Sequence, residues 1–227
     1  MDLLKKYLPT KLDELVISDN GVKYLLEDIV NGYKINNLLF IGTNGTAKST
    51  IAKLLPTLIE GYEPFYTLIE GEEKLDVNFE LERLNNLNTF GGVMTQKYQY
   101  VIFNEIDKVK SNLALFWQLV DTWHSNIILI ATANSYQSID RCLRSRFKVV
   151  EFSAIKASDF LPRAMQILTN ENILLDEAFV LSQLKLKENL SDIRKYMDVL
   201  SDIYRNHKAG RIQNVHYVGA TKLGLAA

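Results

Sequence analysis

The chain has 227 residues, 47% of them hydrophobic and 23% charged, with a formal net charge of −1. This length fits one large domain, or one large domain and one small one. The charge excludes a chain that is basic throughout, so any contact with nucleic acid must come from a local patch or from an assembly with other subunits.

Cys142 is the only cysteine, which excludes an internal disulfide and gives no sign of an oxidising compartment. The N-terminal residues lack the sustained apolar stretch of a secretory signal, and no apolar run is long enough to span a membrane. We therefore expect a cytoplasmic protein with no membrane contact.

Short apolar runs predict strands, and apolar residues at helical spacing predict helices between them. We expect Pro56 to bend or shorten the first helix, and Phe79, Leu81 and Leu84 to face inward from the second. The alternation favours an α/β fold with a parallel sheet and helices on both faces. The expected strands span 37–41, 65–69, 98–103, 127–131 and 149–152, and the expected helices span 49–59, 77–87 and 113–123.

The sequence changes character near residues 153–158, where β-branched runs give way to apolar residues at helical spacing. Residues 215–218 fit a short strand. Three more helices are expected, at 160–170, 176–186 and 191–204. We predict an α/β domain over 1–154, a small all-α domain over 155–206 and a C-terminal tail over 207–227.

A phosphate-binding loop is predicted between the first strand and the first helix. Backbone N–H groups around Gly45 and Thr46 can turn toward phosphate oxygens, Lys48 adds a compact positive charge, and the Ser49 hydroxyl is a suitable Mg²⁺ ligand. The alternative is a strand–turn–helix unit with a fortuitous Lys-Ser pair. The loop comprises Gly42, Thr43, Asn44, Gly45, Thr46, Ala47, Lys48, Ser49 and Thr50.

Ala47 stands where the standard loop pattern has glycine. If this position requires a positive φ, the methyl group costs about 1 kcal/mol. Loops of the Ala-Lys-Ser form occur in working ATPase families, including replicative MCM helicases and MoxR-type ATPases, so we interpret Ala47 as tolerated.

The third strand ends in Asn104-Glu105. Sites that hydrolyse ATP commonly place Asp-Glu here, where the first residue supports the Mg²⁺ shell and the second polarises the attacking water. Glu105 fits the second role. Asn104 keeps a carbonyl ligand but lacks one negative charge, so we expect weaker support of Mg²⁺ and slower hydrolysis. Solvated charges at a strand end are the alternative.

Three further polar residues fit an ATP site. Asn134 ends the fourth strand, where its amide can contact the γ-phosphate or the attacking water; closing a turn is an equal alternative. Arg146 precedes the last strand, from where an arginine can reach a neighbouring subunit's ATP site. Arg194 begins a helix of the second domain and can return to the nucleotide. Taken alone, both arginines fit ordinary surface positions better.

Together and in this order, these segments resemble one family, the AAA+ clamp-loader subunits: replication factor C small subunits and their archaeal and phage counterparts. The resemblance covers about residues 4–204, and the 189–204 segment is especially similar to the lid of the tailed-phage clamp-loader subunit. LRSRF resembles the family's serine-arginine-cysteine finger segment, with Phe147 in place of the cysteine. The segments that carry the resemblance are YLPTKLDELV, GTNGTAKST, VIFNEID, ATAN, LRSRF and NLSDIRKYMDVL.

The resemblance implies an ATPase with ATP and Mg²⁺ as cofactors, and it implies residue roles. Ser49 and Asn104 would hold the metal, and Lys48 the phosphates. The catalytic set would be Glu105 as the catalytic carboxylate, Asn134 and Arg194 as the two sensors, and Arg146 acting in trans. The residues near the adenine would be Tyr7, Pro9, Val16 and Ile17.

The resemblance also implies partners: a sliding clamp, other clamp-loader subunits in a hetero- or homo-oligomeric ring, and primer–template DNA in the cytoplasm of a bacterial host. Lys108 and Lys110 would be candidate contacts to DNA phosphates. We expect the family's helical collar domain to be absent, because the sequence ends about where it would begin. Two alternatives stay open: a nucleotide-binding scaffold with little hydrolysis, and another AAA+ remodeller such as a helicase loader.

Overall fold

The computed structural model describes residues 3–33, 36–90, 96–110, 113–122, 126–137, 139 and 141–214. The chain divides into two compact units, one formed by residues 9–155 and the other by residues 1–8 together with 156–227. The division at 155/156 falls one residue from the expected one. The N-terminal segment differs from expectation, because it belongs to the helical unit and not to the α/β unit.

The α/β unit is built on a sheet whose strands, in the described part of the chain, all run parallel in the order β2-β3-β4-β1-β5. Strand β1 lies inside the sheet, between β4 and β5, and its first four residues are all buried. Burial on both faces explains why the inner strands β1, β3 and β4 are nearly continuous apolar runs. The strands are β1 (Leu38–Gly42), β2 (Tyr66–Glu70), β3 (Gln99–Asn104), β4 (Ile127–Ala133) and β5 (Lys148–Phe152).

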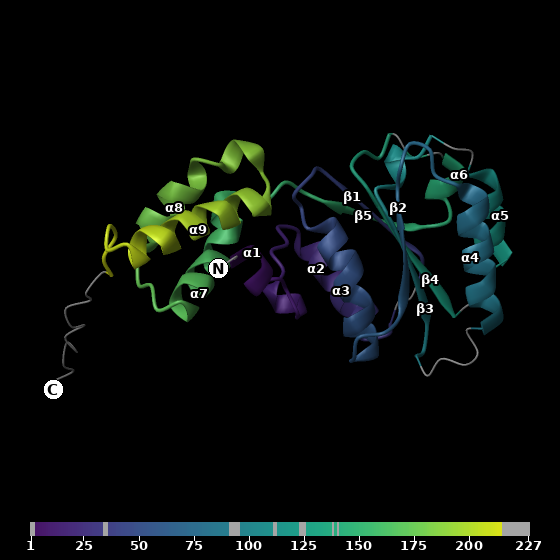
Figure 1. Cartoon of the computed structure of the whole chain (residues 1–227), viewed down its shortest axis with the longest axis horizontal. Helices are drawn as coiled ribbons and strands as arrows, with labels where there is room; N and C mark the ends of the chain where they lie inside the picture. Colours follow the sequence, from purple (N-terminus) through teal and green to yellow (C-terminus); the bar gives the residue numbers. More distant parts are fainter. Residues whose placement is uncertain are drawn as a thin grey trace, which may run out of the picture. The chain divides into compact units, whose positions relative to one another are not determined.

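Helices cover both faces of this sheet (Figure 1). Successive strand residues point to opposite faces, so Phe40 packs in the cluster formed with α2 and α3, and Leu39 in the cluster formed with α4 and α5. The predicted parallel α/β fold is therefore confirmed. The helical segments of this unit are η1 (Leu12–Glu14), α2 (Asn20–Val30), α3 (Lys48–Glu60), α4 (Val77–Phe90), η3 (Ile106–Lys108), α5 (Ala114–Thr122) and α6 (Arg141–Arg144).

The inward orientation expected of Phe79 is wrong, and of the two effects expected of Pro56 the shortening does not occur. Helix α3 continues to Glu60 with the proline buried. An interior proline costs about 3 kcal/mol, which the burial of the apolar face of α3 can offset. Phe79 is 58% exposed, because the buried stripe of α4 runs through Glu80 and Leu84. At helical spacing Phe79 lies roughly 200° around the axis from Leu81, on the solvent side.

The second unit contains only helices among its described residues. Asp176 caps α8 by accepting hydrogen bonds from the N–H groups of Ala178 and Phe179, and the rings of Phe160 and Tyr196 stack in the core at 5.2 Å. Residues 215–218, where a strand was considered, lie outside the described residues. The helical segments are α1 (Leu3–Lys6), α7 (Ala157–Asn170), α8 (Glu177–Lys185), η4 (Glu188–Leu190) and α9 (Ile193–Lys208).

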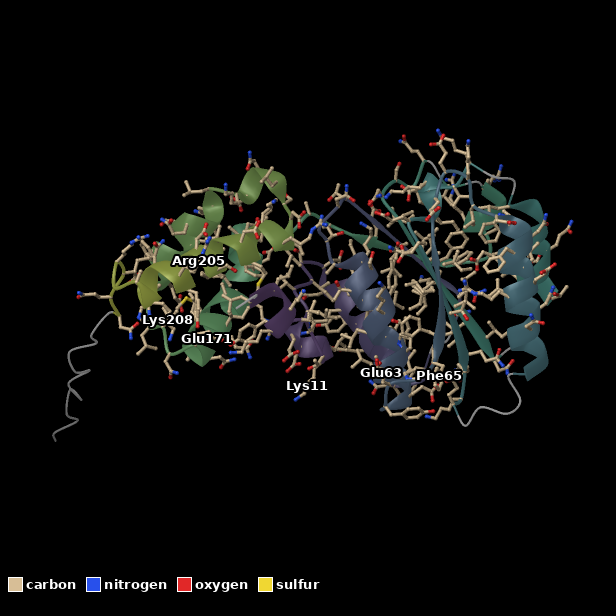
Figure 2. All side chains as sticks on the ribbon, viewed as in Figure 1. Lys11, Glu63, Phe65, Glu171, Arg205 and Lys208 are labelled. Atoms are coloured by element: carbon tan, nitrogen blue, oxygen red, sulfur yellow. The ribbon has the colours of Figure 1, made fainter. Side chains whose placement is uncertain are left out.

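The N-terminal segment is tied to this helical unit through Glu171, the residue that follows α7. Glu171 is labelled in Figure 2. Lys6 forms an ion pair with Glu171, and the Tyr7 hydroxyl donates to the same carboxylate at 2.6 Å. Leu3 is fully buried. The hydrogen bond from Lys6, followed by that from Tyr7, lowers the pKa of Glu171 below its ordinary value of 4.5. Among the described residues, no helix has the length and apolar character needed to cross a membrane.

Candidate active site

The carboxyl end of β1 opens into a tight loop that requires glycine at its first position. A Cβ on Gly42 would lie 2.4 Å from the carbonyl oxygen of Phe152 on the neighbouring strand β5. Gly45 has φ 80°, in the left-handed region that favours glycine. These two glycines let the chain turn from the sheet into the first turn of α3 within a few residues.

Ala47 adopts φ 63° and ψ 11° and is the residue from which α3 begins. The position therefore does require a positive φ, as the glycine of the standard pattern suggests. Thr46 is buried, and its hydroxyl donates to the Thr43 carbonyl at 2.8 Å, which closes the loop on itself. The strained alanine is held in place by this internal bond and by helix α3.

The Lys48 side chain is buried inside the loop, only 7% exposed. Its ammonium donates to the carbonyl oxygens of Gly42 and Thr43, both at 2.7 Å. A lysine charge enclosed by a loop at a helix N-terminus is chemically suited to phosphate oxygens.

Ser49, Asn104 and Thr132 form one hydrogen-bonded network across three elements. The Ser49 hydroxyl on α3 donates to Oδ1 of Asn104 at 2.6 Å, and the Thr132 hydroxyl on β4 donates to the same oxygen at 2.8 Å. A serine hydroxyl that gives its proton to Asn104 keeps its lone pairs for a cation. The Ser49 hydroxyl oxygen therefore fits Mg²⁺, which prefers oxygen ligands, and Asn104 supports that oxygen through their hydrogen bond.

Glu105 lies at the end of β3 in the left-handed region, with φ 53°. Its backbone N–H donates to the Thr132 hydroxyl at 2.9 Å. Its carboxylate forms an ion pair with Lys108, three residues later in the chain. The Lys108 ammonium donates a hydrogen bond to this carboxylate, and that bond raises the pKa of Lys108. The expected catalytic carboxylate is thus beside the loop network and carries a lysine partner. Lys110, the other lysine considered for DNA contact, pairs with Glu73 at 2.5 Å.

Glu70 joins the site from the end of β2, where it is the register partner of Asn104. The side-chain amide of Asn104 donates through Nδ2 to Oε2 of Glu70 at 2.7 Å. The other carboxylate oxygen of Glu70 lies 4.0 Å from the Lys53 ammonium. This carboxylate is a direct neighbour of the expected metal-supporting residue.

Asn134 follows β4 and lies one residue beyond the paired Ile41 and Ala133, which places it beside the start of the loop. Its backbone N–H donates to Oδ2 of Asp107 at 3.0 Å. The other carboxylate oxygen of Asp107 is buried and has no hydrogen-bond partner within the described residues. The strand ends therefore bring Asn134 to the same sheet edge as Lys48 and Glu105.

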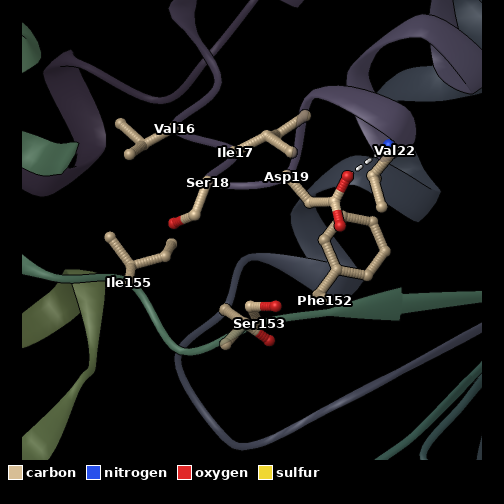
Figure 3. A pocket seen from close by; sticks show the side chains of 9 residues that line it. Val16, Ile17, Ser18, Asp19, Val22, Phe152, Ser153 and Ile155 are labelled. Atoms are coloured by element: carbon tan, nitrogen blue, oxygen red, sulfur yellow. Dashed lines mark hydrogen bonds between the residues drawn. The ribbon is translucent and has the colours of Figure 1, made fainter.

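A pocket next to the loop is lined by two of the residues expected near the adenine, Val16 and Ile17 (Figure 3). It also reaches Thr46 of the loop and Phe152 at the end of β5. Tyr7, also expected here, belongs to the helical unit and binds Glu171. Pro9, the fourth expected residue, is not among the residues that line this pocket.

The two expected arginines both bind carboxylates of the chain itself. Arg146 donates through its guanidinium to both oxygens of Asp121 on α5, at 2.7 and 2.5 Å, and this lowers the pKa of Asp121. Arg194 in α9 likewise donates to both carboxylate oxygens of Asp192, the residue that caps its own helix. A role in trans for Arg146 and a sensor role for Arg194 stay predictions.

Sequence reasoning missed three polar residues of this site: Glu70, Asp107 and Thr132. Glu70 and Thr132 had a signal, because each directly follows a predicted strand, and the carboxyl ends of parallel strands meet at one edge. Asp107 follows its predicted strand by four residues, in η3. The sequence does not show the register between β2 and β3, and this register places Glu70 opposite Asn104.

A parallel sheet with a lysine-bearing phosphate loop and an acidic strand end defines the class of P-loop nucleotide-binding proteins. The family model AAA, "ATPase family associated with various cellular activities", matches residues 38–154, so the chain belongs to this family.

Curated relatives carry replication factor C and sliding-clamp-loader names, so the resemblance to this group of subunits is confirmed. "Replication factor C small subunit 2" of Pyrobaculum arsenaticum is 27% identical over 176 residues, covering 76% of this chain and 54% of its own length. "Replication factor C small subunit 1" of Pyrobaculum aerophilum is 28% identical, with 86% and 60% covered. "Sliding-clamp-loader large subunit" of Escherichia phage RB69 is 27% identical, with 85% and 61% covered. The chain thus spans little more than half the length of these relatives.

Among solved structures, the RuvB Holliday junction branch migration motor of Thermotoga maritima shares the fold. Its TM-score is 0.72 at 14% identity, covering 92% of this chain and 69% of that one. At this level of identity the likeness concerns the fold alone.

Proposed function

We propose that this chain is an ATP-hydrolysing subunit of a sliding-clamp loader that acts in DNA replication. One observation carries the proposal: Lys48, Ser49, Asn104 and Glu105 lie together at the carboxyl edge of the sheet, linked by the hydrogen bond from Ser49 to Asn104. The clamp-loader names of the relatives support the choice among ATPases. Its partners would be a sliding clamp, further loader subunits and primer–template DNA.

Each residue has a distinct part in the proposed reaction. Lys48 and the loop N–H groups bind the β- and γ-phosphates of ATP, while Ser49 and Asn104 hold the Mg²⁺ ion. When bound, Mg²⁺ neutralises charge on the phosphate oxygens. Glu105 orients and polarises the water that attacks the γ-phosphorus, as the bond to the bridging oxygen breaks and ADP leaves. Val16 and Ile17 offer apolar contact to the adenine.

Roles for Asn134 and Arg146 belong to the same proposal, as does that of Arg194 as the second sensor, which would return to the nucleotide. Asn134 would contact the attacking water or γ-phosphate from the end of β4. Arg146 would leave Asp121 and enter the site of the neighbouring subunit, where its planar guanidinium offsets charge on the transferring phosphoryl group.

A second candidate is a nucleotide-binding scaffold with little hydrolysis. Two observations favour it: Asn104 lacks the charge of the usual aspartate, and Glu105 is paired with Lys108. Both features weaken hydrolysis without preventing nucleotide binding.

The substitution Glu105→Gln tests the proposal in the chain assembled with its loader subunits, clamp and primed DNA. We expect ATP turnover to fall by at least about 100-fold, because the amide is a poor base, while nucleotide affinity stays within about twofold. Phosphate release and binding of a fluorescent ATP analogue are the two measurements. Glu73→Gln, which removes a charge from an exposed carboxylate, serves as the matched control and should change neither.

The outcomes separate the candidates. Unchanged turnover in Glu105→Gln rejects the catalytic role of this carboxylate. A wild-type assembly that binds the analogue but releases phosphate no faster than buffer favours the scaffold. Failure of the wild-type assembly to bind adenine nucleotides rejects the proposal.

A further inference from the structure

The orientation of the Asn104 side-chain amide is fixed by its neighbours. An ionised carboxylate only accepts hydrogen bonds, so the Asn104 atom facing Glu70 must be the amide nitrogen. The amide oxygen then faces the hydroxyls of Ser49 and Thr132, both of which donate to it. Glu70 therefore determines that an oxygen, and not an NH₂ group, points to the expected metal-binding serine.

The backbone holds Glu70 in this position. The register pairs Glu70 with Asn104, and the N–H of the next residue, Gly71, donates to the Asn104 carbonyl at 2.7 Å. A Cβ on Gly71 would lie 2.1 Å from the carbonyl oxygen of Glu105, so only glycine permits this close approach. The end of β2 is thereby fixed against the end of β3.

The carboxylate of Glu70 places a negative charge beside Asn104, whose side chain is neutral. Asn104 occupies a position at which ATP-hydrolysing sites commonly have aspartate, and it contributes no charge. A hydrogen bond to a carboxylate is charge-assisted and polarises the amide, which increases the negative partial charge on its oxygen. The carboxylate and the amide together offer what a single aspartate would: a negative charge and an oxygen directed at Ser49.

We propose that Glu70 is a positioning residue of the Mg²⁺ site, which orients Asn104 and supplies the negative charge that Asn104 lacks. This inference rests on the proposed nucleotide-binding function. It assigns the support of the metal to two neighbouring strands, β2 and β3, where an aspartate would supply it from one.

The first test is Glu70→Gln in the full chain, measured by equilibrium binding of a fluorescent ATP analogue over a series of Mg²⁺ concentrations and in EDTA. Glutamine can keep the contact to Asn104, so the substitution removes mainly the charge. Loss of an outer partner of a metal ligand typically weakens metal affinity 10- to 100-fold. We expect the Mg²⁺ concentration for half-maximal binding to rise about tenfold, with unchanged affinity in EDTA.

The second test exchanges the two groups in the double variant Glu70→Gln, Asn104→Asp. The glutamine amide can donate to the new aspartate, which restores one charge and one directed oxygen. We expect the Mg²⁺ dependence to return to within about threefold of wild type, a rescue that a purely structural role for Glu70 would not give. Glu73→Gln removes an exposed carboxylate from the following loop and should leave the titration unchanged. Thermal unfolding checks that all variants are folded, as the half-exposed Glu70 side chain leads us to expect.

Three results overturn the inference. In the first, Glu70→Gln titrates with Mg²⁺ as wild type does. In the second, it loses affinity equally with Mg²⁺ and in EDTA, which indicates damage to the loop. In the third, the double variant is no better than Glu70→Gln. A wild-type chain that binds no nucleotide at any Mg²⁺ concentration is distinguishable from all three, because it overturns the proposed function itself.

Discussion

Individual residues of the site hold unusual backbone conformations. Among the described residues, four other than glycine have a positive φ, and two of these, Ala47 and Glu105, lie in the candidate active site. Such conformations cost about 1–3 kcal/mol each and persist only where the surrounding structure enforces them. The sequence anticipated a strained Ala47 from the missing glycine, but nothing in the sequence signalled the turn at Glu105.

Ala47→Gly should stabilise the chain. Glycine adopts φ 63° without steric penalty, so we expect the free energy of unfolding to rise by about 0.5–1 kcal/mol despite the greater freedom of the unfolded chain. Urea unfolding measures the change. Ala52→Gly is the matched control, since Ala52 is buried in the interior of α3, and there the same substitution should destabilise by about 1 kcal/mol or more. Equal destabilisation by both would show that Ala47 is unstrained.

Side-chain pairings were the least predictable feature at this scale. Lys48, Ser49 and Glu105 could be chosen because each lies in a short motif with fixed spacing. The contacts from Glu70 to Asn104 and from Arg146 to Asp121 join segments 34 and 25 residues apart, and they depend on strand register and helix placement. A single sequence carries no direct record of such pairings.

At the scale of elements, the predicted strands match the observed ones to within a few residues, and the signal is clearest in the inner strands β1, β3 and β4, which are buried and therefore nearly uniformly apolar. Helix α2 was not predicted, although Asp19 caps it and Val22, Leu26 and Ile29 give it a buried face. Its signal was present in the spacing of these residues. The exposed Phe79 shows the opposite error, in which an aromatic residue was assigned to the core by type and not by position.

Gly71→Ala should disrupt the contact between the ends of β2 and β3. The added Cβ meets the backbone of Glu105, which cannot move as a flexible side chain would, so we expect a loss of roughly 2–3 kcal/mol in unfolding free energy. Gly61→Ala is the control: its φ is positive but its Cβ meets open space, so about 1 kcal/mol is expected. Chemical denaturation compares the two, and a Gly71→Ala variant no less stable than Gly61→Ala contradicts the close approach.

At the scale of the whole molecule, the helical unit is not one continuous stretch of the chain. Residues 1–8 join the helical unit, whose other residues begin at 156, so this unit is formed from both ends of the described chain. The boundary near 155 was visible in the sequence as a change of periodicity. The return of the N-terminal segment was not, because it depends on the contacts of Leu3, Lys6 and Tyr7 with distant helices.

The contact between the N-terminal segment and Glu171 should weaken in acid. The pKa of Glu171 is lowered by its hydrogen bonds from Lys6 and Tyr7, so its stabilising contribution is present above its ordinary pKa of 4.5 and is lost as pH falls through the lower, folded-state value. We expect wild type to lose more stability than Glu171→Gln between about pH 5 and pH 3. Circular dichroism during urea unfolding, over this range, measures the difference. Glu177→Gln, an exposed carboxylate in the same unit, should follow wild type; parallel curves for wild type and Glu171→Gln would refute the assignment.

The turns at the two ends of the parallel strands differ in how much sequence change they can accept. Lys48, Glu70, Glu105 and Asn134 all lie in or next to the turns that leave the strands at one edge, so an insertion in any of these turns would displace a functional group. Turns at the opposite edge, such as residues 61–65 before β2, hold none of them. Lengthened or grafted segments, including labels for microscopy, are therefore best placed at that second edge.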